Sequence, residues 1–271
     1  MNLTSPSQVK AWCIENGFHP NKTMGQNFLI DRNALVGIVD AGLAPVADIE
    51  SPKVLEIGPG LGVLTEEMLA RGCRVTAVEK DPVLAARLKS ALGDPAALSV
   101  VPGDALDYIA DGESVGFDCM VSNLPYQAGT RILLELVQRR EIPAMTVLVQ
   151  TEVAERLVAR EGSKTRGLAG VWAQLDYDVA IVRKVAASCF WPRPEIGSSV
   201  VQLVRHDRNV ALSAQERDIF RRLTKKAFEH RRKQLGSIFK DMIQSTARAE
   251  QLSNEDWIDL VKCLVEEDED T

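Results

Sequence analysis

Residues that bind metals or form disulfides are scarce in this sequence of 271 residues. It has three histidines, and its five cysteines are widely scattered without a Cys-x-x-Cys pair. Zinc sites and disulfide frameworks normally show close, recognisable spacings of these residues. The sequence therefore predicts no metal site, and it predicts reduced, mostly buried thiols.

Long apolar runs and a secretory leader are also missing. A membrane-spanning helix needs about 20 consecutive apolar residues, and no run in this sequence approaches that length. The residues after Met1 are polar and lack the basic and apolar regions of a secretory signal. Hydrophobic residues make up 45% of the chain and charged residues 26%, which is typical of globular proteins. We therefore expect a soluble, cytoplasmic protein with no membrane partner.

A general excess of positive charge is absent, but a local excess is present. The formal net charge of −6 argues against a protein that is basic over its whole surface. Residues 205–240 nevertheless hold eleven Lys or Arg against four acids, whereas residues 266–270 are all acidic. The basic stretch could bind phosphate groups, and a solvated helix face is the alternative. Its basic side chains at helical spacing are Arg221, Arg222, Lys225, Lys226, Arg231, Arg232 and Lys233.

Short apolar runs alternate with amphipathic stretches of helix length between residues 53 and 150. This alternation predicts an α/β fold with a Rossmann-like parallel sheet and helices on both faces. Ligands then bind at the carboxyl ends of the strands. The predicted strands are residues 54–57, 75–78, 98–101, 117–122 and 145–150, with a late strand at 198–204.

The pattern changes to helical periodicity after His206. Ser213 and Ser253 each stand three residues before an acid, which is the spacing of a capping box at a helix start. A helix is also predicted at residues 5–17. We therefore expect a ligand-binding domain at 1–206 with an N-terminal helical extension, a small all-helical domain at 207–265, and an acidic tail at 266–271.

A glycine-rich loop follows the first predicted strand, with glycines at 58, 60 and 62. Glycines let the backbone turn sharply and pass close to a ligand. The spacing Gly-x-Gly-x-Gly differs from the dinucleotide fingerprint Gly-x-Gly-x-x-Gly, and Glu56 places an acid just before the loop. A carboxylate there suits a cationic sulfonium better than a pyrophosphate. The sequence therefore favours S-adenosylmethionine over NAD.

Two further acids stand at predicted strand ends. Glu79 ends the second strand, where a carboxylate can accept hydrogen bonds from both hydroxyls of a ribose. Asp104 follows the third strand and could accept a hydrogen bond from an adenine amine. The alternatives are a solvated acid for Glu79 and a helix N-cap for Asp104.

The segment Asn123-Leu124-Pro125-Tyr126 follows the fourth strand. An amine conjugated to a ring is a poor nucleophile because its lone pair is delocalised. An Asn side-chain carbonyl and nearby backbone carbonyls can accept hydrogen bonds from such an amine, and the Tyr ring can stack on the base. The segment therefore indicates methyl transfer to a base amine, with a simple turn as the alternative.

These residues resemble the rRNA adenine dimethyltransferases, in particular the KsgA type that acts on small-subunit rRNA. The likeness runs through nearly the whole chain. It rests on segments 25–31, 56–60, 103–105, 123–126, 190–194, 199–201 and 228–235, together with Glu79.

The resemblance implies a class I methyltransferase sheet and assigns site residues. Asn123 and the backbone of Leu124 and Pro125 would hold the target amine, Tyr126 would stack on the adenine, and Phe190 would approach the base from its other side. A core aromatic is the alternative for Phe190. The implied cofactor-binding residues are Gln26, Asn27, Leu29, Glu56, Gly58, Gly60, Glu79, Lys80, Asp104, Ala105 and Asn123. The basic cluster would bind RNA.

Three segments depart from the pattern of the family. Gln127-Ala128-Gly129 follows Tyr126 where Asn or His, Ile, and Ser or Thr are usual. Glu195-Ile196-Gly197 replaces the common Lys-Val-Asp, and Gly236-Ser237 replaces Arg-Asn. The last two changes remove positive charge from expected RNA contacts.

The implied activity is transfer of two methyl groups from S-adenosylmethionine to the 6-amino group of adenosines near the 3′ end of small-subunit (16S) rRNA. The expected partner is that rRNA within a pre-ribosomal particle, with a role in small-subunit biogenesis, and we expect a monomer. One alternative is a ribosome-assembly or nucleic-acid-binding factor with weak methylation. Another is a large-subunit rRNA adenine methyltransferase of the macrolide-resistance type, or a methyltransferase of small molecules.

Overall fold

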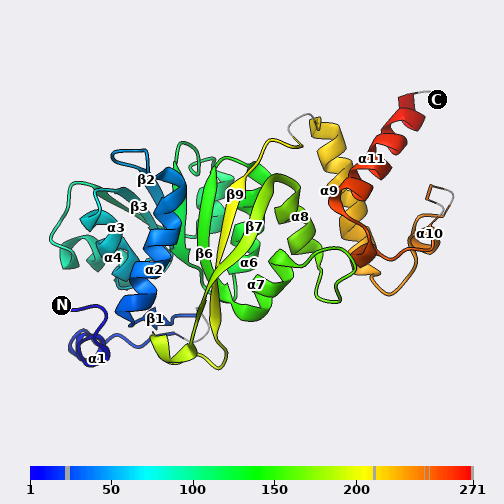
Figure 1. The fold of residues 1–271 in the computed structure, drawn as a ribbon. Helices are drawn as coiled ribbons and strands as arrows, with labels where there is room; N and C mark the ends of the chain where they lie inside the picture. The colour runs from blue at the N-terminus through cyan, green and yellow to red at the C-terminus, as the bar shows by residue number, and fades with distance from the viewer. Residues whose placement is uncertain (22–24, 210–211, 241, 244, 270–271) are drawn as a thin grey trace. The chain divides into compact units, whose positions relative to one another are not determined.

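Seven strands pair into one sheet with the order β4-β3-β2-β5-β6-β9-β7 (Figure 1). The computed structural model describes residues 1–21, 25–209, 212–240, 242–243 and 245–269, with side chains described as far as 265. Neighbouring strands from β2 to β6 run parallel, and β9 joins β6 antiparallel. The predicted α/β class is therefore confirmed. The strands are β2 (Lys53–Ile57), β3 (Arg74–Glu79), β4 (Leu98–Pro102), β5 (Cys119–Asn123), β6 (Ala144–Gln150), β7 (Tyr177–Val185) and β9 (Ser198–Arg205).

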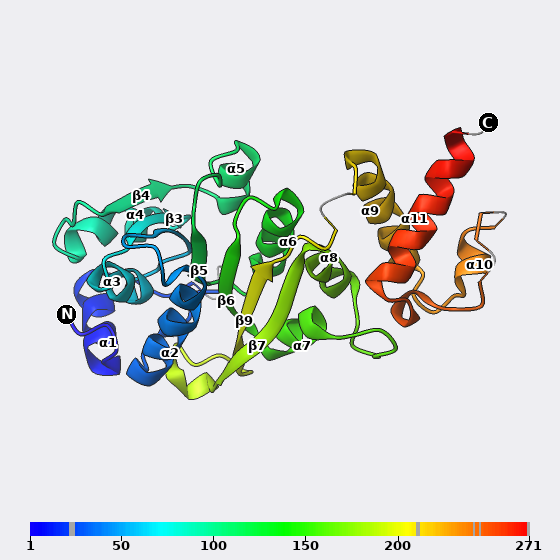
Figure 2. The same cartoon turned by 45° about the horizontal axis from the view of Figure 1, so that its top comes forward.

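Helices cover both faces of this sheet (Figure 2). On one face α2 packs against α3, β5 and β6, and its buried Leu35 and Ile38 join the main hydrophobic core. On the other face α5 packs against α6. The α6 helix buries one apolar stripe, which includes Leu133 and Leu136. These helices are α2 (Arg32–Leu43), α3 (Val63–Ala70), α4 (Pro82–Ala91), α5 (Ala105–Ala110) and α6 (Gly129–Arg139).

The N-terminal segment packs against the sheet domain through a cluster of aromatic side chains. Helix α1 (Pro6–Glu15) follows Ser5 as predicted. The ring centres of Trp12 and Phe18 lie 5.8 Å apart. Phe18 also contacts Phe28, and the ring centres of Phe28 and Trp191 lie 6.5 Å apart. Strands β1 (Phe28–Leu29) and β8 (Phe190–Trp191) pair antiparallel. This small sheet was not predicted, because two-residue strands leave no periodic pattern.

The chain forms two compact units, and their bounds differ from the predicted domains. The first unit contains residues 1–154 and 180–205, and the second contains 155–179 and 206–271. The predicted boundary after residue 206 assigned 155–179 to the first domain. The structure groups this segment with the second unit because α8 (Leu168–Asp176) buries Val171 and Leu175 in the helical core of that unit.

The second unit is built around α9 (Ala214–Glu229) and α11 (Asn254–Glu269), together with α8 and the short α10 (Leu235–Ile238). Trp257 and Phe220 are fully buried in its core. Both predicted capping boxes are present. Ser213 exchanges hydrogen bonds with Glu216, and Ser253 does so with Asp256.

The predicted acidic tail is only partly described. The backbone of residues 266–269 continues α11. The side chains of these residues and all of 270–271 lie outside the described residues. In the described part of the chain, no helix is long and apolar enough to cross a membrane.

A buried ion pair stabilises the second unit. Arg217 Nη1 lies 2.7 Å from Asp176 Oδ2, and the two side chains are only 10% and 5% exposed. Arg217 also donates to the backbone carbonyls of Asn209 and Leu212. Removing the carboxylate would leave the buried guanidinium charge unpaired, which strongly destabilises a folded protein. One of the eleven basic residues of the 205–240 stretch therefore has a structural role.

We expect Asp176→Ala to lower the free energy of unfolding of the second unit by about 3–5 kcal/mol, because the Arg217 charge would stay buried and unpaired. Urea denaturation followed by tryptophan fluorescence measures this. Asp218→Ala is the matched control, since it breaks the exposed pair with Arg222 at 3.0 Å and should cost at most about 1 kcal/mol. Equal losses in the two variants would contradict the role given to the buried pair.

Candidate active site

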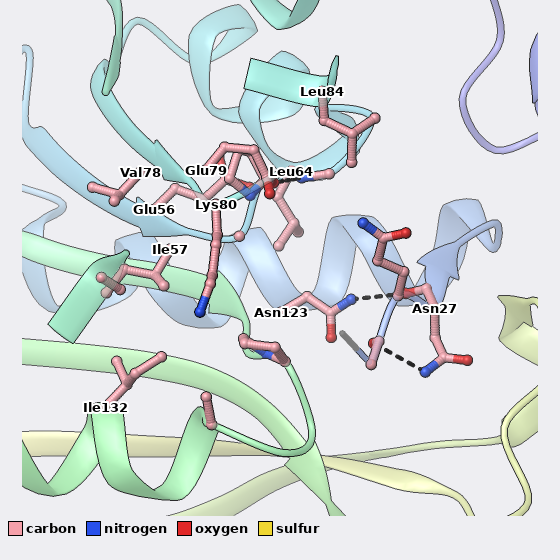
Figure 3. Close-up of a pocket in the computed structure, with 18 of the residues that line it drawn as sticks. Asn27, Glu56, Ile57, Leu64, Val78, Glu79, Lys80, Leu84, Asn123 and Ile132 are labelled. Carbon is pink, nitrogen blue, oxygen red and sulfur yellow. Dashed lines mark hydrogen bonds between the residues drawn. The ribbon is translucent and has the colours of Figure 1, made fainter. Parts of the chain in front are cut away.

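A cavity of about 450 Å³ lies in the first unit at the carboxyl ends of β2, β3, β4 and β5 (Figure 3). The strand order reverses at β2, since β3 lies on one side of it and β5 on the other. Such a reversal opens a crevice at the carboxyl edge of a parallel sheet. All eleven predicted cofactor-binding residues line the cavity: Gln26, Asn27, Leu29, Glu56, Gly58, Gly60, Glu79, Lys80, Asp104, Ala105 and Asn123.

The glycine-rich loop is held against β3 by a carboxylate. Gly60 has a φ of +60°, and a Cβ at this position would lie 3.1 Å from the ring of Phe28. Its N–H donates to Glu79 Oε2 at 3.0 Å, and the N–H of Asp81 donates to Oε1 at 2.8 Å. Glu79 is therefore buried and oriented, not a solvated acid, and burial raises its pKa. Each oxygen keeps a lone pair that a ribose hydroxyl could use.

Asp104 is the N-cap of α5, which is the alternative role predicted for this residue. Its Oδ1 accepts from Leu106 N at 2.9 Å, and its Oδ2 accepts from Lys80 Nζ at 2.7 Å. The hydrogen bond from Lys80 holds the pKa of Asp104 below its ordinary value. Asp104 lines the cavity at the same time. The two roles are compatible, and contact with an adenine amine stays a prediction.

Glu56 is a buried acid in the cavity wall. It is 1% exposed, and Thr65 Oγ1 donates to its Oε2 at 2.6 Å. Burial raises the pKa of Glu56 to about 8, against the lowering effect of the Thr65 hydrogen bond. The nearby charge of Glu79 raises it further. A cationic ligand in this cavity would favour the ionised carboxylate. Thr65 has no motif of its own and could not be found from the sequence.

The side chain of Asn123 is fixed by the segment at residues 25–29. Its Nδ2 donates to the backbone carbonyl of Asn27 at 3.1 Å (Figure 3). Asn27 in turn donates from its own side chain to Gly25 O at 3.2 Å. Since the amide nitrogen of Asn123 is engaged, its Oδ1 is left as the acceptor that can face a ligand.

The backbone after Asn123 is held on both sides. Leu124 N donates to Leu148 O at 3.2 Å, and Pro125 O accepts from Gly129 N at 2.7 Å. Gly129 lies so close to Leu124 that a Cβ would come within 2.9 Å of the Leu124 side chain. A larger residue at 129 would therefore displace the loop. Among the described residues, the Leu124 carbonyl accepts no backbone hydrogen bond.

The two predicted base-contacting aromatics are placed differently. Tyr126 is half-buried and does not line the cavity, although its neighbours Pro125 and Gln127 do. Its hydroxyl lies 2.8 Å from Ser198 Oγ. Contact of Phe190 with the base stays a prediction. In this structure Phe190 is 2% exposed and packs in the main core, the position given by the alternative for this residue. The reason is its register in the β1–β8 pair, where it lies opposite Leu29.

The seven basic residues predicted to bind RNA all lie in the second unit but do not form one free face. Arg222 pairs with Asp218, and Lys226 lies 5.3 Å from the centre of the Phe239 ring. Arg231 lies 3.5 Å from Glu250 and donates to Lys164 O. Arg221 is partly buried. The exposed members of the set with neither an ion pair nor a ring contact among the described residues are Lys225, Arg232 and Lys233.

Comparison with known proteins decides the family. A family model described as ribosomal RNA adenine dimethylase matches residues 17–266. The chain belongs to this family. Ribosomal RNA small subunit methyltransferase A of Deinococcus radiodurans is 43% identical over 74% of this chain and 67% of that protein. The protein of the same name from Moorella thermoacetica is 37% identical over 86% of this chain and 83% of that protein.

Solved structures agree on the fold. A dimethyladenosine transferase from Plasmodium falciparum superposes with a TM-score of 0.74 at 22% identity, covering 89% of this chain and 98% of that one. The structure of the 23S rRNA methyltransferase ErmE superposes with a TM-score of 0.65 at 22% identity, covering 88% of this chain and 100% of that one. The predicted class I methyltransferase sheet is confirmed. Membership of the family also confirms the predicted enzyme class, a methyltransferase that uses S-adenosylmethionine to modify rRNA adenine.

In the described part of the chain, no group of three or more His, Cys, Asp or Glu side chains could hold a metal ion.

Ionisation of Glu56 should make stability depend on pH. The pKa of Glu56 is about 8 in the folded protein against an ordinary value of 4.5, so the folded state holds this proton more tightly. The stabilisation is complete below pH 4.5 and is lost as pH rises towards 8, because the folded state resists losing this proton. We expect Glu56→Gln, which cannot ionise, to lack this loss. Denaturation of the parent protein and of Glu56→Gln at pH 6 and pH 8, without ligand, measures the free energy of unfolding of each. An equal change between the two pH values in both proteins would contradict the role given to Glu56.

Proposed function

We propose that this protein transfers two methyl groups in succession from S-adenosylmethionine to the 6-amino group of adenosines near the 3′ end of small-subunit rRNA. The observation that carries the proposal is the fixed side chain of Asn123 at the edge of the cofactor cavity. Its amide nitrogen is engaged by Asn27 O, so its oxygen is the group that can accept from an incoming amine. The relatives named small subunit methyltransferase A favour this substrate over large-subunit rRNA.

The residues of the cavity fit S-adenosylmethionine. A buried acid, Glu56, suits a ligand that carries positive charge, and Glu79 offers two oriented oxygens to a ribose. The tight turn at Gly60 keeps the floor free of a side chain. S-adenosylmethionine supplies an electrophilic methyl group on a sulfonium sulfur. The protein residues supply binding and orientation.

The protein acts on the amine by hydrogen bonding. Asn123 Oδ1 and Leu124 O would accept the two N–H groups of the amine, which localises its lone pair towards the cavity. The same oxygens would stabilise the positive charge that develops on nitrogen. A strong base is not needed before transfer, because the amine loses its proton after it becomes cationic. Tyr126 would stack on the base and hold it in line. The target base must be unpaired or flipped to enter.

The second unit would supply affinity for RNA. Lys225, Arg232 and Lys233 are exposed cations in a chain of net charge −6. Cations of this kind bind phosphates and release counterions. We propose that the substrate is presented within a pre-ribosomal particle, and that the protein acts there as a cytoplasmic monomer. These finer statements extend the family assignment, which itself implies an rRNA substrate.

The amide of Asn123 can be tested by mapping the modification. We expect dimethyladenosine near the 3′ end of small-subunit rRNA in cells that carry the parent protein and its absence in cells without it. Asn123→Ala should fail to restore it and should lower the rate of methyl transfer by about 100-fold or more, because the amine loses its acceptor in the transition state. Mass spectrometry of rRNA measures the product. Unchanged transfer by Asn123→Ala would exclude the mechanism.

The exposed cations can be tested by salt dependence. Replacing Lys225, Arg232 and Lys233 by Gln should reduce the slope of log affinity against log salt for small ribosomal subunits by about two to three units. The control replaces three exposed cations of the first unit, Lys53, Arg74 and Lys89, in the same way.

Binding of S-adenosylmethionine should be unaffected in both of these variants. An equal change of slope in the control would place the RNA contact outside the second unit.

A further inference from the structure

A hydrogen bond between two side chains joins the loop after β5 to the first residue of β9. The hydroxyl of Tyr126 lies 2.8 Å from Ser198 Oγ, although the two residues are 72 positions apart in the chain. Ser198 is 1% exposed, and Tyr126 is half-buried. A hydroxyl pair in such surroundings is partly shielded from water, which strengthens the hydrogen bond between the two groups.

Ser198 itself is firmly placed. In the β6–β9 pair it lies opposite Gln150, the last residue of β6. The carbonyl of the preceding residue, Gly197, accepts from both the N–H and the hydroxyl of Thr151, each at 3.1 Å. The start of β9 is thus tied to the end of β6 at the point where Ser198 meets the tyrosine. Ser198 therefore presents its hydroxyl from a rigid element.

The other end of Tyr126 is also restrained. A Cβ on Gly25 would lie 3.0 Å from Tyr126 N, so the segment before β1 packs closely on this part of the loop. The hydrogen bond between Gly129 N and Pro125 O restrains the residue before it. With the backbone held in this way, the remaining freedom of Tyr126 is rotation of its side chain. The bond to Ser198 fixes the position of the hydroxyl and so restrains the direction in which the side chain points.

We infer that Ser198 is a positioning residue for methyl transfer, which holds the Tyr126 ring in the orientation on which the target base stacks. The inference rests on the proposed function, in which Tyr126 stacks on the adenine. Ser198 is buried, does not line the cofactor cavity, and contacts the hydroxyl of Tyr126, so its effect on the substrate passes through Tyr126. A stacking surface that is already oriented loses less conformational entropy when the base arrives. Burial raises the pKa of Tyr126, so its hydroxyl stays protonated and able to donate.

The hydrogen bond can be tested with Ser198→Ala, Tyr126→Phe and the double variant on isolated small ribosomal subunits. We expect each single variant to lower kcat/KM for the RNA substrate by about tenfold, since each leaves one hydroxyl unpaired and frees the ring. The double variant should be no slower than either single one, because both changes remove the same bond. The KM for S-adenosylmethionine should stay at the parent value.

A spectroscopic signal separates positioning from a general loss of structure. An RNA fragment with 2-aminopurine at the target position should show quenched fluorescence when its base stacks on Tyr126 of the parent protein, and weaker quenching with Ser198→Ala. Ser198→Thr keeps the hydroxyl and should restore both quenching and rate. Thr146→Val is the control, since it removes a buried hydroxyl without a hydrogen-bond partner from the neighbouring strand β6. It should behave as the parent does.

The outcomes distinguish this inference from the proposed function. If the parent protein does not methylate small subunits, the proposed function fails before any variant is measured. If the parent is active and Ser198→Ala equals it in rate and quenching, the positioning role is excluded. Additive losses in the double variant would also exclude it, because the two residues would then act independently. A Ser198→Thr variant as slow as Ser198→Ala would show that side-chain size and not the hydroxyl matters.

Discussion

The reversal of strand order at β2 is the constraint on which the rest of the site depends. Because β3 and β5 flank β2, the chain leaves the carboxyl edge of the sheet in opposite directions on the two sides of this strand. The loops separate there and leave the cavity between them. Gly58, Glu79, Asp104 and Asn123 all stand at or just after strand ends, so one topological feature brings together residues that are far apart in the sequence.

Two buried acids, Glu56 and Glu79, line the cavity. Burial raises the pKa of both Glu56 and Glu79, which means that the fold disfavours their charge in the absence of a ligand. A ligand with a positive charge reverses this preference, and its binding is linked to the ionisation of these acids.

A second feature of the site is that the loop at residues 123–126 is held by the segment before β1. Asn27 O fixes the amide of Asn123, and Gly25 packs against the backbone of Tyr126. The polar loop at 25–29, which alone has no regular structure beyond the short strand β1, therefore acquires its role only when it lies against the 123–126 loop. Catalysis by orientation depends on such contacts, since a rigid acceptor must meet the amine in one geometry.

The amino-acid sequence by itself determined the sheet, the cofactor loop and the residues at strand ends, since strand and helix periodicity and glycine spacing are local properties. That Glu56, Glu79 and Asn123 line one cavity was predictable for this reason. Only the tertiary structure decided that Phe190 belongs to the core, that residues 155–179 pack with the helical unit, and that Ser198 meets Tyr126. Each of these depends on which distant segments become neighbours, and pairing between distant segments leaves no periodic signal in the chain.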